Sequence, residues 1–162
     1  MTAEHDAWNA LDIRRPGDVP AFTPLTWLLE KETEHSHRLG NNALPTDFPH
    51  QVERGTAADA LAALALREAV RRRVDQERAV RVREALTLGA TWSQLAAALD
   101  VTPDEARALL RDWAEGQHQL HRGDVADGRP RPFGLDDQAH AAVLALCELD
   151  DDQAAAVPAG TA

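Results

Sequence analysis

The stretch 82–113 constrains the fold more than any other part of the chain, because two helix starts within it carry the same capping device. Each start has a Thr followed three residues later by Gln or Glu, so that each side chain satisfies a backbone N–H of the other residue. The two capping boxes are Thr91 with Gln94 and Thr102 with Glu105. Pro103 follows the second cap at the first helical position, where a missing N–H costs nothing. The pattern predicts three short helices.

Glycines and apolar spacing complete this prediction. Gly89 is expected to close the first helix and Gly116 the third. The spacing of the apolar residues indicates that each of the two later helices has one inward face. It also indicates a turn at Asp100 and Val101 between them. These are Leu95, Ala96, Leu99, Val101, Ala106, Leu109, Leu110 and Trp113.

The segment 92–113 resembles the helix-turn-helix of bacterial DNA-binding proteins. The matching positions are a small residue in the first helix, a Leu before the turn, an apolar residue after it, a capping Thr and an apolar residue facing back. They are Ala96, Leu99, Val101, Thr102 and Ala106. The family usually has Gly in the turn, and this chain has Asp100, which tolerates a left-handed backbone better than most residues. The resemblance covers about 30 of 162 residues and implies DNA binding, with 78–88 as the supporting helix.

An all-α fold is expected, with a tri-helical helix-turn-helix core between flanking helices and a flexible acidic tail. The expected segments are an N-terminal arm at 1–22, a helix and loop at 23–56, a long helical segment with the helix-turn-helix at 57–116, a linker at 117–135, a C-terminal helix at 136–150 and a disordered tail at 151–162. No strand-like alternation follows the third helix, so a β-wing is not expected.

The long helical run 57–88 carries two apolar stripes that point in different directions. Leu66 and Val70 lie on the first stripe, and Val82 and Leu86 lie on the second. The pattern predicts a bend near 75–78 or different packing partners for the two halves.

Charge is unevenly distributed along the chain. The net charge is −10, and the segments 1–53, 54–122 and 123–162 carry −5, +1 and −6. Seven arginines decorate 67–83, and their spread around the helix fits solvated side chains interleaved with Glu better than it fits a phosphate-binding row. A protein that depends on phosphate attraction is expected to be more basic.

The helix after Thr102 presents the candidate DNA-reading residues. Arg107 and Arg111 are expected to read guanine through bidentate contacts in the major groove. Asp104 either accepts a hydrogen bond from a cytosine amino group or marks a protein contact. The other candidates, for contacts with phosphates, are Thr91, Ser93, Gln94, Thr102, Arg78 and Arg81.

Enzyme chemistry, metal binding and membrane insertion are not expected. Neither His35 with His37 nor His118 with His121 has the partners of a metal site, and Cys147 lies on an apolar stripe. The chain has no phosphate-binding Gly loop, nucleophile motif, cofactor motif or membrane-length apolar run. A single Cys suits a reducing cytoplasm.

Two functions from different classes remain open. The first is a cytoplasmic, DNA-binding transcriptional regulator that acts as a homodimer, because a lone corner reads few base pairs. The second is a helical adaptor that keeps the corner as a scaffold and binds another protein, such as a component of the transcription machinery. A small-ligand-responsive regulator is a weaker third option.

Overall fold

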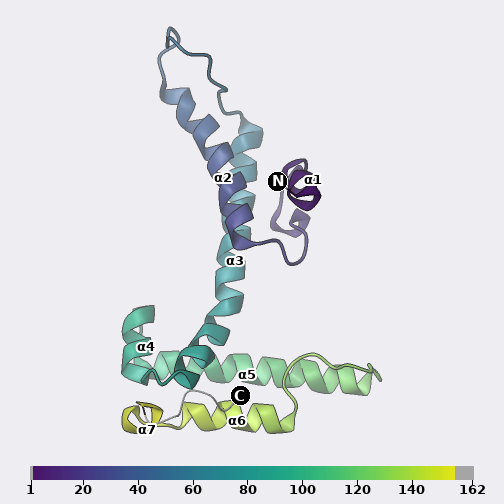
Figure 1. The fold of residues 1–162 in the computed structure, drawn as a ribbon, viewed down its shortest axis with the longest axis vertical. Coiled ribbons are helices and arrows are strands. Elements are labelled where there is room, and N and C mark those ends of the chain that lie inside the picture. Colours follow the sequence, from purple (N-terminus) through teal and green to yellow (C-terminus); the bar gives the residue numbers. More distant parts are fainter. Residues whose placement is uncertain (1, 156–162) are drawn as a thin grey trace. The chain divides into compact units, whose positions relative to one another are not determined.

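The computed structural model describes residues 2–155, apart from the side chains at positions 152 and 155. Within this range the fold is all-α, as the sequence predicts (Figure 1). The chain forms two compact units, Met1–Asp75 and Gln76–Ala162. Each unit has a hydrophobic core of its own.

The first unit packs two helices and the N-terminal arm against the beginning of a third helix. It contains α1 (Ala3–Asn9), α2 (Leu25–Gly40), the first part of α3 (Ala57–Thr87) and two short 3₁₀ turns, Pro16–Asp18 and Asn41–Ala43. Trp8, Ile13, Leu28 and Leu66 fill its core. The arm is held by Lys31, whose Nζ donates to the carbonyl oxygens of Trp8 and Asn9 at 3.0 and 2.9 Å.

The long helix α3 takes part in both units. It is helical throughout Ala57–Thr87, so the helix has no break near 75–78, and the alternative prediction of different packing partners for the two halves holds. Leu66 packs in the core of the first unit, whereas Val82 and Leu86 pack in the core of the second. The two apolar stripes differ in direction because each stripe serves a different core.

The second unit contains the helix-turn-helix. Its helices are α4 (Trp92–Leu99), α5 (Pro103–Ala126), α6 (Asp137–Cys147) and α7 (Asp151–Ala155), which follow the last part of α3. α6 lies alongside α5 (Figure 1). Asp136 caps α6, because its side chain accepts a hydrogen bond from the backbone N–H of Ala139 at 2.8 Å.

The prediction that the helix after Thr102 ends at Gly116 is wrong. α5 continues to Ala126, so residues 117–126 are helical and do not belong to a linker. The extension packs against the segment that leads into α6. Gln117 accepts a backbone hydrogen bond from Leu135 at 3.2 Å, and the ring of His118 stacks on that of His140. Tertiary packing thus outweighs the cost of a Gly inside a helix, about 1 kcal/mol.

The predicted boundaries near the C-terminus are also wrong in part. α6 ends at Cys147, and Asp151–Ala155 forms the short helix α7 instead of a disordered tail. Asp150 begins α7 through a capping box with Gln153: Asp150 accepts from the N–H of Gln153 at 2.7 Å, and Gln153 accepts from the N–H of Asp150 at 3.2 Å. The rest of the predicted tail, 156–162, lies outside the described residues.

Candidate functional site

The helix-turn-helix corner is built by the two capping boxes and a left-handed residue between them. Both boxes form as predicted, at Thr91 with Gln94 and at Thr102 with Glu105. Asp100 ends α4 with φ 54° and ψ 47°, the left-handed conformation for which Gly is usual in this turn. The next residue, Val101, is 38% exposed, so the prediction that it faces inward is wrong.

A compact core holds the corner in place. Trp92, Ala106 and Leu110 are fully buried and pack with Val82 and Leu86 of α3. This arrangement matches the expected tri-helical core, in which α3 supports α4 and α5.

The two arginines expected to read DNA bases are held by residues that follow α6. The guanidinium of Arg107 lies over the ring of Trp92, 5.2 Å from the ring centroid, and donates to the backbone oxygen of Leu149 at 3.4 Å. Only 25% of the Arg107 side chain is exposed. Arg111 donates to the Glu148 carboxylate at 3.0 Å. Both guanidinium groups are therefore paired with oxygen atoms of residues 148 and 149, although Arg111 stays half exposed.

The same C-terminal residues also engage the start of α4. The backbone N–H of Ser93 donates to Asp151 Oδ1 at 3.2 Å, and the Ser93 hydroxyl donates to Asp151 Oδ2. These hydrogen bonds, helped by the charge of Arg107, hold the pKa of Asp151 below its usual range. We call residues 148–154 the C-terminal acidic segment. It contacts Ser93, Arg107 and Arg111.

The acidic segment binds through apolar contacts as well. Leu149 packs against the core of the second unit, and Ala154 is fully buried in it. Just before the segment, the backbone oxygen of Leu146 accepts a hydrogen bond from Trp92 Nε1 at 3.3 Å. The segment therefore meets the corner with both carboxylates and aliphatic groups.

The remaining predicted site residues have other partners. The capping boxes engage Thr91, Gln94 and Thr102. Asp104 is almost fully exposed and lies 3.4 Å from Arg107. Arg78 and Arg81 lie exposed on α3, where Arg81 donates to Glu84 at 2.8 Å.

The solvent-exposed side of α5 is acidic. Its exposed carboxylates near the corner are Asp104, Glu105, Asp112 and Glu115. The second unit as a whole has 8 arginines against 15 Asp and Glu residues, a net charge of −7. A DNA backbone that approached this side of α5 would meet repulsion from the surrounding protein.

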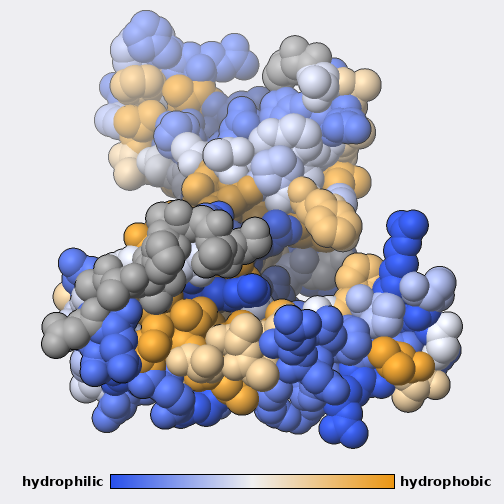
Figure 2. Space-filling view, turned by 60° about the horizontal axis from the view of Figure 1, so that its bottom comes forward, coloured by the Kyte–Doolittle hydropathy of each residue, from blue (hydrophilic) through white to orange (hydrophobic). Residues whose placement is uncertain are grey.

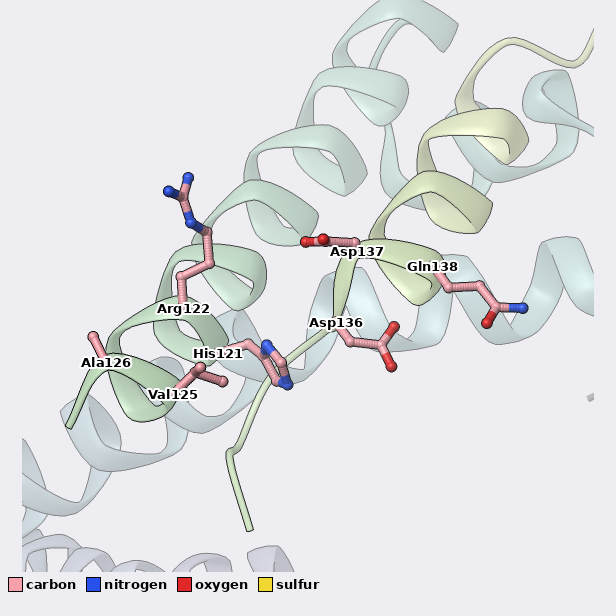
Figure 3. Close-up of a pocket in the computed structure, with 7 residues that line it drawn as sticks. All are labelled: His121, Arg122, Val125, Ala126, Asp136, Asp137 and Gln138. Atoms are coloured by element: carbon pink, nitrogen blue, oxygen red, sulfur yellow. The ribbon is translucent and has the colours of Figure 1, made fainter. Parts of the chain in front are cut away.

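An open pocket of about 550 Å³ lies between the end of α5 and the start of α6 (Figure 3). It is lined by His121, Arg122, Val125, Ala126, Asp136, Asp137 and Gln138. In Figure 3 Arg122 turns away from the other polar side chains, so they do not converge on one point. Among the described residues no group of three or more His, Cys, Asp or Glu is placed to hold a metal ion.

The outer side of α6 exposes an apolar surface. Ala141, Ala142 and Ala145 of α6 are exposed. Figure 2 shows that hydrophobic residues also gather on one face of the molecule. On a soluble domain, an exposed apolar patch is typical of surfaces that contact other proteins.

Sequence reasoning missed the partners of the corner, namely Glu148, Leu149 and Asp151. One signal was present: Asp150 and Gln153 have the same spacing as the two capping boxes that identify α4 and α5. That spacing predicts a helix start, and acidic residues in a first turn are stabilised by the helix dipole. It does not predict where the new helix packs.

Comparison with known proteins adds no family assignment, because no protein-family model, no curated protein and no solved structure matches this chain. Within the described part of the chain, no helix has the length and apolar character needed to cross a membrane.

Proposed function

We propose that this protein is a helical protein-binding adaptor in which the helix-turn-helix corner is a receptor for a protein segment. The observation that carries this proposal is the occupancy of the corner by the C-terminal acidic segment. Ser93, Arg107 and Arg111, three of the residues expected to contact DNA, bind Asp151, the Leu149 carbonyl and Glu148.

Electrostatics favours a protein partner over DNA. DNA affinity depends on Lys and Arg side chains that replace counterions along the phosphate backbone. In this unit the net charge is −7, and exposed carboxylates flank the two arginines along α5. A protein segment can bind by contacting only the narrow surface that contains Ser93, Arg107 and Arg111. The surrounding carboxylates therefore repel a protein segment less than they repel a DNA backbone.

DNA binding by a transcriptional regulator is the second candidate, and one observation favours it. A single segment contacts Ser93, Arg107 and Arg111, so release of that segment would free all three from these hydrogen bonds at once. The alternation of caps and apolar residues at the corner also fits the helix-turn-helix pattern.

Titration of the full chain onto a short random-sequence DNA duplex separates the two candidates. At about 50 mM salt, where phosphate contacts are strong, we expect no saturable change in fluorescence anisotropy. Binding that weakens steeply with added salt and with Arg107→Ala, but not with Arg129→Ala, would overturn the adaptor proposal. Arg129→Ala is the matched control because it removes the same charge from a residue that pairs with Asp124 and is not a candidate DNA contact.

A further inference from the structure

We infer that Ser93, Arg107 and Arg111 form a binding site for an acidic and apolar segment of a partner protein, and that the C-terminal acidic segment fills this site as an exchangeable ligand from within the chain. This inference rests on the proposed function, since it names the partner class and the regulation of the same corner.

The surface offers a set of hydrogen-bond donors that suits carboxylates. Ser93 supplies a backbone N–H and a hydroxyl in the first turn of α4, where unpaired N–H groups and the helix dipole attract an anion. Arg107 and Arg111 supply two guanidinium groups, one of which is oriented by the ring of Trp92. Each donor is matched by an oxygen of residues 148–151.

The present occupant shows which chemistry the surface accepts. Glu148 and Asp151 place carboxylates on Arg111 and Ser93, while Leu149 and Ala154 pack against the apolar core. A nucleic acid supplies phosphates but no aliphatic side chains to fill the positions of Leu149 and Ala154. The site therefore favours a polypeptide that combines two carboxylates with small or aliphatic residues.

The ion pair between the acidic segment and Arg111 lies at the surface of the unit. The Glu148 and Arg111 side chains are 76% and 49% exposed, and ion pairs at such positions contribute little to stability. The core under the corner also contains residues outside the segment, since Trp92, Ala106 and Leu110 pack with Val82 and Leu86 of α3.

An internal ligand lowers the apparent affinity for an external one. The partner binds only the open fraction of the molecules, so its apparent dissociation constant rises in proportion to the closed population. The acidic segment would then set a threshold for partner binding at this corner. Any change that weakens the segment should tighten binding in trans.

The test is an NMR titration of the ¹⁵N-labelled full chain with a synthetic peptide that has the sequence of residues 148–155. We expect shifts at Ser93, Arg107 and Arg111, and a dissociation constant at least about tenfold lower for the Glu148→Gln/Asp151→Asn variant than for the wild type. The control variant Asp112→Asn/Asp127→Asn removes two exposed carboxylates that lie outside the acidic segment, and should bind like the wild type. Adding Arg107→Ala and Arg111→Ala to the first variant should abolish binding.

Equal peptide affinities in the wild type and the Glu148→Gln/Asp151→Asn variant, or no binding to either, would overturn the inference and leave the contact purely structural. The single variant Glu148→Gln provides a second test, because the exposed Glu148 side chain can change without disturbing the core. This variant should bind the peptide more tightly than the wild type, by a smaller factor than the double variant does. If a DNA duplex replaces the peptide and shifts the same resonances, the proposed function itself fails.

Discussion

At the scale of single residues, the corner depends on short-range hydrogen bonds that respond to pH. Glu105 accepts hydrogen bonds from the backbone N–H and the hydroxyl of Thr102, both at 2.8 Å. These bonds hold the pKa of Glu105 below its usual value of 4.5. A carboxylate whose pKa is lowered in the folded state stabilises that state above its unfolded pKa, and this contribution is lost as the pH falls through the folded pKa.

Glu105→Gln should therefore lower stability in a pH-dependent way. Gln keeps the length and the acceptor of the capping box but loses the charge at the start of α5. We expect a lower urea midpoint than that of the wild type at pH 7, with the two midpoints converging as the pH falls below 4.5. A difference of the same size at every pH would show that the charge of Glu105 has no part in the cap.

At the scale of the element, the length of α5 is the feature that departs most from the sequence pattern. Gly116 lies inside the helix with negative φ, and a Cβ atom added there would meet nothing within 4 Å. Gly116→Ala should therefore stabilise the second unit by roughly 0.5–1 kcal/mol in urea unfolding, because Ala loses less conformational freedom in a helix.

A contrasting Gly provides the control for this measurement. Gly134 has φ +88°, and a Cβ atom at this position would lie 2.1 Å from the Gln117 backbone oxygen. Gly134→Ala should therefore destabilise the unit. If Gly116→Ala were destabilising as well, Gly116 would be the end of the helix, as the sequence pattern suggests, and α5 would not continue to Ala126.

The elements that sequence reasoning predicts correctly are those fixed by local chemistry. The Thr91 and Thr102 caps act over three residues, so their spacing alone locates the starts of α4 and α5. The continuation of α5 past Gly116 depends on packing against Leu135 and α6, which no local pattern records. Asp100 belongs to the first kind, since a short polar side chain tolerates the left-handed conformation that ends α4.

At the scale of the whole molecule, two cores share one long helix, and the functional surface belongs to the second unit alone. The position of the candidate site on α4 and α5 could be predicted from the sequence, but the residues that contact it could not. Helical spacing places Arg107 and Arg111 on one side of α5, yet their partners Leu149 and Glu148 come 42 and 37 positions later in the chain. Asp151 comes 58 positions after its partner Ser93. Only the folded unit shows that acidic residues fill the surface expected to attract phosphate.

The central claim is that the C-terminal acidic segment is docked on the corner, and a double-mutant cycle on Ser93 and Asp151 tests it most directly. The stabilities of Ser93→Ala, Asp151→Ala and the double variant would be measured by urea unfolding at pH 7. We expect the sum of the two single losses of unfolding free energy to exceed the loss in the double variant. Residues in direct contact do not contribute additively to stability. A parallel cycle with Asp112→Ala in place of Asp151→Ala should be additive. Additive losses for Ser93 and Asp151 would contradict the claim, since they would mean that the segment does not bind the corner in solution.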